Sequence, residues 1–202
     1  MTALNGPLLY ARSRGLPGAI AAPPAIALLL AWSASRPDGG SWDPGFGLPM
    51  EAICPMLAAA VIGTSLYAYA DELDRTAVRA WWPRRLTHLL ALTALAATAL
   101  ALAAASGTTG TGASVMARNT VGTVGATAIS AVLVGARLSW LPVTAYLGTA
   151  FIAARTAGGT GATVWAWPVQ PDRATAAWVT AAALFAAGAA LHAYRGPRPD
   201  HL

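Results

Sequence analysis

Six apolar stretches dominate the sequence, and each approaches the length needed to cross a lipid bilayer. A transmembrane helix requires about 20 mostly apolar residues, within a range near 17–25. The stretches lie at residues 16–35, 52–70, 86–106, 120–136, 138–156 and 174–194. The pattern predicts an all-α fold. We expect a polytopic membrane protein in which residues 1–202 form a single transmembrane domain with six transmembrane helices.

The composition excludes the main alternatives to a membrane protein. Only 10% of the residues are charged, whereas a soluble domain carries roughly 25%. The 56% share of hydrophobic residues also excludes a disordered chain, which combines low hydrophobicity with high charge. The chain has 1 cysteine, which excludes a disulfide scaffold and a cysteine-built zinc site.

The arginines predict how the helices are oriented, because basic residues beside transmembrane helices concentrate on the cytoplasmic side. With the N-terminus inside, the cytoplasmic arginines are Arg12, Arg14, Arg75, Arg79, Arg84, Arg85, Arg137, Arg195 and Arg198. The outer ones are Arg36, Arg118, Arg155 and Arg173. We therefore expect both termini in the cytoplasm and residues 1–15 as a cytoplasmic interfacial helix.

The basic residues do not indicate nucleic-acid binding, because no dense basic tract exists and the arginines flank apolar stretches. All 13 basic residues are arginine. The absence of lysine and the abundance of alanine are typical of a GC-rich, actinobacterial-like genome. We therefore expect the protein in a bacterial plasma membrane.

The cytoplasmic segment at residues 71–88 is unusually rich in charge, holding seven of the 21 charged residues. An apolar stripe formed by Leu73, Ala77, Ala80 and Trp81 predicts a short amphipathic helix. Pro83 would end this helix, so we place it at residues 71–85. It could lie on anionic lipid or bind a cytoplasmic protein. Its three acidic residues count against binding to lipid alone.

The motif in this segment resembles the coupling segment of ABC-2-type (type V exporter-like) ABC transporter permease subunits. That family carries an acidic pair, a threonine, a proline and one or two arginines that lead into the third helix. The matching residues here are Asp71, Glu72, Asp74, Thr76, Pro83, Arg84 and Arg85. Arg75 replaces the family's glycine, and the family's leucines are replaced by Val78, Trp81 and Trp82.

The resemblance implies a permease subunit of an ABC exporter, which forms the substrate pathway as a homodimer. A separate ABC ATPase subunit would supply the ATP and Mg chemistry, because a chain without lysine has no Walker lysine. The residues implied to bind the ATPase are Asp71, Glu72, Asp74, Arg75, Thr76, Arg79, Trp81, Pro83, Arg84 and Arg85. We expect no cofactor in this chain itself. The apolar helices favour a hydrophobic or amphipathic substrate, with membrane lipid as the surroundings.

Polar groups within the apolar stretches offer few candidates for catalysis, and we expect no catalytic or metal-binding residue. His88 and His192 lie near the ends of stretches and lack metal-ligand spacing. Cys54 has no partner and is typical of a small packing residue. A membrane-embedded enzyme acting on lipid, dependent on His88 or His192, remains an alternative. A second alternative is a non-transport accessory or immunity protein.

Four residues near the fourth stretch are candidates for the substrate pathway. Gly122 and Gly125 are typical of close helix packing but could also line a pathway. Arg118 and Asn119 at its outer end could contact a polar substrate or extend to the interface. The outer segment at residues 163–168 contains Trp165 and Trp167. These tryptophans favour anchoring at the membrane interface, with re-entry into the outer leaflet as the alternative.

Overall fold

The computed structural model describes residues 16–34, 50–67, 81–106, 112–154 and 162–198. Within these ranges the chain is helical and contains no strand, which confirms the predicted all-α class. The long helices are α2 (Leu16–Ala34), α3 (Met50–Ser65), α5 (Trp82–Ser106), α6 (Ala113–Val134), α7 (Trp140–Ala154) and α9 (Thr175–Arg195). Two short turns, α8 (Ala162–Trp165) and η1 (Trp167–Val169), precede α9. The predicted interfacial helix at 1–15 and residues 71–80 of the predicted coupling helix lie outside the described residues.

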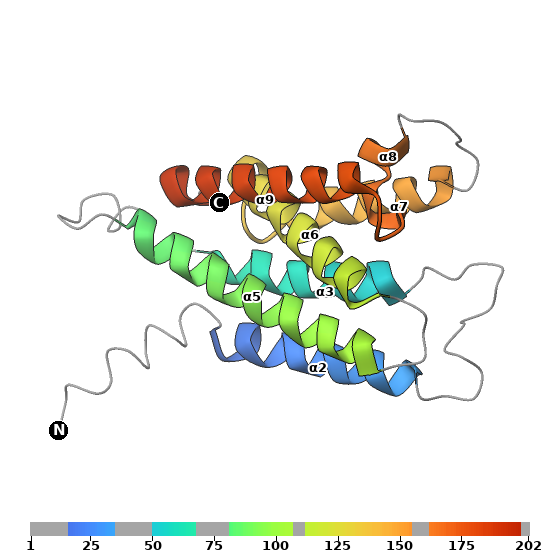
Figure 1. Cartoon of the computed structure of the whole chain (residues 1–202). Helices are drawn as coiled ribbons and strands as arrows, with labels where there is room; N and C mark the ends of the chain where they lie inside the picture. The colour runs from blue at the N-terminus through green and yellow to red at the C-terminus, as the bar shows by residue number, and fades with distance from the viewer. Residues whose placement is uncertain (1–15, 35–49, 68–80, 107–111, 155–161, 199–202) are drawn as a thin grey trace, which may run out of the picture.

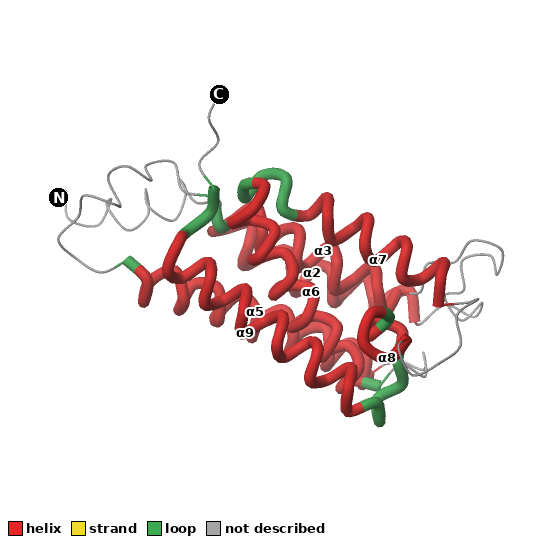
Figure 2. Tube along the Cα trace, turned by 90° about the horizontal axis from the view of Figure 1, so that it is seen from above, coloured by secondary structure: helices red, strands yellow, loops and turns green. Residues whose placement is uncertain are grey.

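The long helices lie side by side, and successive helices alternate in direction (Figure 1). Helix α6 is central and packs against α3, α5, α7 and α9. Helix α2 lies at one edge of the bundle, on α3 and α5, and α9 lies at the opposite edge (Figure 1). Seen from above, the described loops lie at the ends of the helices (Figure 2). The bundle therefore has two ends, and the helix termini and connections gather at them.

Two of the helices in the described ranges, α5 and α9, are long and apolar enough to cross a membrane. Shorter apolar helices occupy Pro17–Trp32, Ala52–Ser65 and Trp140–Ala153. The sequence predicts six transmembrane helices. Because two of the described helices are long and apolar enough, the number six is not confirmed and stays a prediction. Helix α2 begins at Leu16 and continues through Pro23 and Pro24.

Helix α6 carries polar residues and is not among the helices apolar enough to cross a membrane, yet much of it is buried in the bundle. The hydroxyls of Thr120, Thr123 and Thr127 donate to backbone carbonyls of their own helix four residues earlier, at 2.8, 2.5 and 2.9 Å. A buried polar group costs little free energy once it is hydrogen-bonded. A hydropathy value summed over residues does not count these hydrogen bonds. It therefore overestimates the cost of burying the threonines of α6.

The contact between α6 and α9 is close because both helices carry glycine where they meet. A Cβ atom at Gly125 would lie 2.4 Å from Cα of Phe185, and one at Gly188 would lie 2.3 Å from the carbonyl oxygen of Gly125. Both distances are too short for a side chain, so the backbones themselves are in contact. Glycine in a helix costs about 1 kcal/mol relative to alanine, and here this cost permits the close packing that the sequence predicted.

The interior of the bundle contains an apolar core together with buried polar side chains, and large apolar side chains are exposed on the outside. Arg118, Asn119 and the three threonines of α6 are buried. The surface carries large apolar side chains such as Leu102 (70% exposed), Ile152 (74%) and Tyr194 (76%). Soluble proteins rarely expose apolar surface on several helices at once. This distribution of side chains suits helices surrounded by lipid.

Candidate functional site

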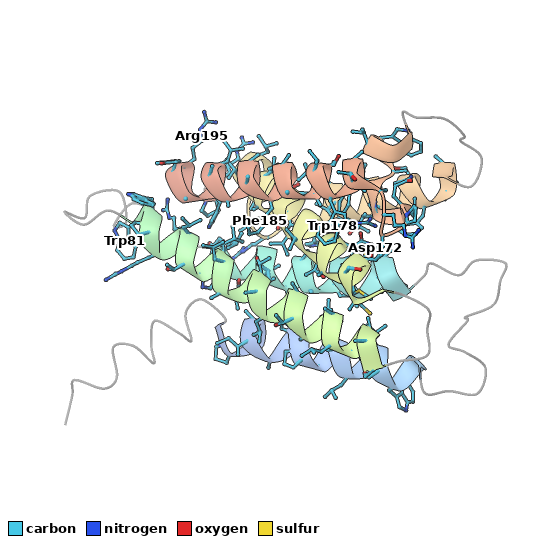
Figure 3. The ribbon with its side chains drawn as sticks, in the orientation of Figure 1. Trp81, Asp172, Trp178, Phe185 and Arg195 are labelled. Carbon is cyan, nitrogen blue, oxygen red and sulfur yellow. The ribbon has the colours of Figure 1, made fainter. Side chains whose placement is uncertain are left out.

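One end of the bundle, termed here the basic end, gathers Arg84, Arg85, Arg137, Arg195 and Arg198. It is formed where α3 ends, α5 begins, α6 turns into α7, and α9 ends. The acidic residues within the described ranges, Glu51 and Asp172, belong to segments at the opposite end. Figure 3 shows Trp81 and Arg195 at the basic end and Asp172 and Trp178 at the other.

Tyr67 and Trp81, the described residues on either side of residues 68–80, both lie at the basic end. The guanidinium of Arg137, from the α6–α7 connection, lies over the ring of Tyr67 at 4.6 Å from its centroid. The guanidinium of Arg84 lies over the ring of Trp81 at 5.0 Å. Such cation–π contacts stabilise a structure by about 0.5–1 kcal/mol at exposed sites. Arginine therefore contacts an aromatic ring on either side of residues 68–80.

The start of α5 is tied to the end of α9. The rings of Trp82 and Tyr194 stack, with centroids 6.2 Å apart. Helix α5 begins at Trp82, earlier than the predicted boundary at residue 86. Pro83 therefore occupies the first turn of α5. Backbone N–H groups there have no acceptor within the helix, so a proline at this position costs no hydrogen bond. Its predicted role was to end the preceding helix.

Arg84 and Arg85 are adjacent in sequence but occupy different environments. The side chain of Arg84 is exposed, whereas Arg85 is buried. A Cβ atom at Gly196 would lie 2.6 Å from Nη1 of Arg85, so this guanidinium contacts the backbone directly after α9. Gly196 has a φ of 72°, a conformation that favours glycine. A cation at this position also stabilises the carbonyl end of α9.

The carbonyl end of α6 also receives an arginine from a distant part of the chain. Nη1 of Arg198 donates to the carbonyl oxygen of Leu133 at 3.0 Å. The backbone N–H of Arg198 donates to the carbonyl oxygen of Ala131, also at 3.0 Å. The last carbonyls of a helix lack partners within the helix, so these bonds satisfy them. The C-terminal segment after α9 is thereby held against α6.

The opposite end of the bundle, termed here the cap end, is closed by residues 166–171, which we name the cap. Arg118 of α6 is 0% exposed. Its Nη2 and Nη1 atoms donate to the carbonyl oxygens of Gln170 at 2.7 Å and Pro171 at 3.1 Å. Nδ2 of Asn119 donates to the carbonyl oxygen of Pro168 at 2.8 Å. These two side chains lie under the cap and bind its backbone.

Trp167 belongs to the cap, and its ring packs against α6 and α9. It is 1% exposed, and a Cβ atom at Gly122 would lie 2.4 Å from its Cη2 atom. Trp167 forms a small apolar cluster with Ala177 and Ala181 of α9, separate from the main core. The absence of a side chain at Gly122 therefore makes room for the indole ring.

The flanks of the cap are held from two further helices. The hydroxyl of Tyr146 in α7 donates to the carbonyl oxygen of Trp165. Nε1 of Trp178 in α9 donates to the carbonyl oxygen of Asp172 at 3.1 Å. Three helices, α6, α7 and α9, thus bind this short segment, which contains the turn η1.

The histidines considered for catalysis, His88 and His192, lie in α5 and α9. Ser65 and His88 approach to 3.2 Å between Oγ and Nε2. The Ser65 hydroxyl also donates to the carbonyl oxygen of Ile62 at 2.6 Å. The described residues contain no group of three His, Cys, Asp or Glu side chains that could hold a metal ion.

The structure brings together some predicted site residues and leaves others outside its range. Trp81, Pro83, Arg84 and Arg85 lie at the basic end. The predicted pathway residues Gly122, Gly125, Arg118 and Asn119 lie in the α6–α9 contact and under the cap. The remaining predicted ATPase-binding residues, Asp71, Glu72, Asp74, Arg75, Thr76 and Arg79, lie outside the described residues.

Sequence reasoning assigned no contact to Tyr67, Arg137, Gly196 or Arg198. A single arginine in a short connection between helices, such as Arg137, does not indicate its contact. The Gly196-Pro197-Arg198 sequence could have indicated where α9 ends, because glycine is frequent directly after a helix.

Comparison with known proteins gives no match to a family model, to a curated protein or to a solved structure.

Proposed function

We propose that this chain is the membrane-spanning permease subunit of an ABC exporter of the ABC-2 type. Two copies would form the substrate pathway. A separate ATPase subunit would bind the segment at residues 71–85 and supply ATP hydrolysis. The proposal starts from the motif in that segment, and the arrangement of the bundle around it adds physical support.

A location in the membrane is supported by the distribution of polarity in the bundle. The polar side chains of α6 are buried, and large apolar side chains cover the outside. Of the seven arginines in the described ranges, five lie at the basic end (Arg84, Arg85, Arg137, Arg195 and Arg198) and two at the cap end (Arg118 and Arg173). This asymmetry agrees with the basic end facing the cytoplasm of a bacterium.

Coupling to an ATPase is supported by the way both flanks of the 68–80 segment are fixed. Tyr67 at one flank contacts Arg137 of the α6–α7 connection. At the other flank, Trp82 contacts Tyr194 of α9. A displacement of the segment would therefore reach α6, α7 and α9 directly. This double attachment is the structural observation that carries the proposal, because a motor subunit needs such a link to change the bundle.

Within the predicted ATPase-binding set, Arg84 and Arg85 would contribute in different ways. Arg84 is exposed and available to an acidic surface of a partner. Arg85 contacts the backbone at Gly196, so it would transmit movement of α5 to α9 without touching the partner.

The proposal is tested by charge reversal within the 71–85 segment, followed by purification from native membranes. We expect the wild-type chain to co-purify with an ATPase that carries a Walker motif, and Glu72→Lys combined with Arg79→Glu to lose it. Arg173→Glu, at the cap end, is the matched control and should retain the ATPase. If the reversed variant still co-purifies with the ATPase and still supports export, the proposal is wrong.

A further inference from the structure

We propose that Trp82, Tyr194 and Arg195, where α5 begins and α9 ends, form a binding site for the headgroup of an anionic phospholipid. The inference rests on the membrane location contained in the proposed function. It does not depend on an ATPase, and it concerns a surface outside the predicted ATPase-binding set.

The two rings of this site are held together but remain open to the surroundings. Trp82 and Tyr194 stack with their centroids 6.2 Å apart and their planes 24° from parallel. Their side chains are nevertheless 45% and 76% exposed. Tryptophan and tyrosine with an exposed ring are typical of the level where lipid headgroups meet the acyl chains. The pair therefore marks this level on the α5–α9 side of the bundle.

The site offers hydrogen-bond donors that the protein itself does not use. The indole N–H of Trp82, the hydroxyl of Tyr194 and the guanidinium of Arg195 make no hydrogen bond or ion pair with any described residue. Arg195 is exposed and extends outward from the end of α9 (Figure 3). Phosphate and ester oxygens of a phospholipid accept hydrogen bonds from such groups. A lipid headgroup therefore provides the acceptors that these donors lack.

The charge around the site favours a headgroup that is negative overall. The acidic residues of the described ranges, Glu51 and Asp172, belong to segments at the other end of the bundle. Each arginine close to an anionic membrane surface contributes about fivefold to binding. A zwitterionic headgroup carries an ammonium group beside its phosphate, and the arginines of the basic end would repel this group. The site therefore fits phosphatidylglycerol better than phosphatidylethanolamine.

The surface of α9 next to the site is apolar and suits the acyl chains of the same lipid. Ala187, Ala190 and Tyr194 are exposed, and their spacing of three and four residues places them on one face of the helix. On α5, Leu90 is 43% exposed. A phospholipid with its headgroup at Arg195 would thus lay its acyl chains along side chains that avoid water.

A second copy of the chain fits this surface less well than a lipid does. Symmetric dimers bring the same residues of both copies together at the interface. A dimer formed through this face of α9 would place the Arg195 side chains of the two copies close to each other. Like charges repel at such a distance, whereas an anionic headgroup neutralises the guanidinium.

The site is tested by native mass spectrometry of the full chain, purified in detergent and titrated with single phospholipids. Phosphatidylglycerol and phosphatidylethanolamine with identical acyl chains are the probes. We expect the first phosphatidylglycerol to bind at least about fivefold more tightly than the first phosphatidylethanolamine. Equal affinities of the wild-type chain for the two lipids would overturn the proposal.

Arg195→Gln should weaken the binding of phosphatidylglycerol by about fivefold and leave that of phosphatidylethanolamine unchanged. Arg173→Gln removes the same charge from an exposed position at the cap end and should leave both affinities unchanged. An equal loss in the two variants would show an effect of net charge alone and overturn the site. If Arg195→Gln instead dissociates a dimer and keeps wild-type lipid binding, the surface is an interface between copies and the proposal is wrong.

A second variant tests the ring donors and keeps the rings in place. Trp82→Phe combined with Tyr194→Phe removes the N–H and the O–H and should weaken phosphatidylglycerol binding by at least about fivefold. Unchanged binding would overturn the site even if Arg195→Gln proved unstable. Because no ATPase is present, these failures leave the proposed function intact. A wild-type chain recovered in the aqueous fraction of cells instead of the membrane fraction would overturn both.

Discussion

The guanidinium of Arg118 donates a 2.7 Å hydrogen bond to the backbone carbonyl oxygen of Gln170, which lies 52 residues further along the chain. The first turns of α6 and the cap before α9 are therefore one structural unit. The same unit contains Trp167, whose ring occupies the space that Gly122 leaves open.

Trp167→Ala should lower the free energy of unfolding by about 3–5 kcal/mol, because it empties a buried site of the largest side chain. Trp165→Ala is the matched control, since Trp165 is partly exposed and uses only its backbone carbonyl to bind Tyr146. Its cost should stay below about 1 kcal/mol. Thermal unfolding in detergent measures both, and equal losses would contradict the burial of Trp167.

Gly188→Ala should destabilise the bundle by about 1–3 kcal/mol, because its new methyl group would collide with the carbonyl oxygen of Gly125 and overpack the contact. Gly148→Ala in α7 is the matched control, since nothing lies within 4 Å of its new Cβ. Alanine there should be neutral or stabilising by up to about 1 kcal/mol. Gly188→Ala should lower the unfolding temperature and Gly148→Ala should not, and an equal decrease in both would refute the backbone contact between α6 and α9.

Replacing Arg85 with glutamine should cost about 1–2 kcal/mol of stability, because the positive charge at the carbonyl end of α9 is lost. Arg84→Gln is the control at the neighbouring position, where the exposed side chain stacks on Trp81 and the expected cost is at most about 1 kcal/mol. Unfolding of both variants under identical conditions gives the comparison. A larger loss for Arg84→Gln would reverse the roles assigned to the two arginines.

The contact between Arg137 and Tyr67 should matter for coupling more than for stability. Tyr67→Phe keeps the ring that lies under the guanidinium and should behave as wild type. Tyr67→Leu and Arg137→Gln each remove the contact, which contributes about 0.5–1 kcal/mol, and should lower export per ATP hydrolysed in the assembled transporter. Undiminished export per ATP in both variants would remove this flank from the proposed coupling route.

Sequence reasoning was accurate for features that depend on local pattern. Apolar stretches and glycine spacing predicted the helices and the close packing at Gly122 and Gly125, because these depend on composition over one or two turns. The α6 threonines show where summed hydropathy misleads, since their hydroxyls bond to the carbonyls of their own helix.

Contacts between distant segments could not be predicted from the sequence, for a physical reason. Nothing local to Arg118 indicates that its acceptors are the carbonyls of Gln170 and Pro171, because those atoms occur in every residue. The difference between Arg84 and Arg85 is similar. It depends on the rotational position of each residue at the start of α5 and on where α9 ends.

The central claim is that the segment at residues 71–85 binds a separate ATPase, and site-specific photo-crosslinking in native membranes tests it most directly. A photoreactive residue in place of Thr76, with one in place of Arg173 as the control, would capture neighbouring chains for identification by mass spectrometry. The account predicts that position 76, and not position 173, cross-links to a chain that carries a GxxxxGK[ST] phosphate-binding loop. Cross-links from position 76 only to lipid, or only to chains without that loop, would contradict it.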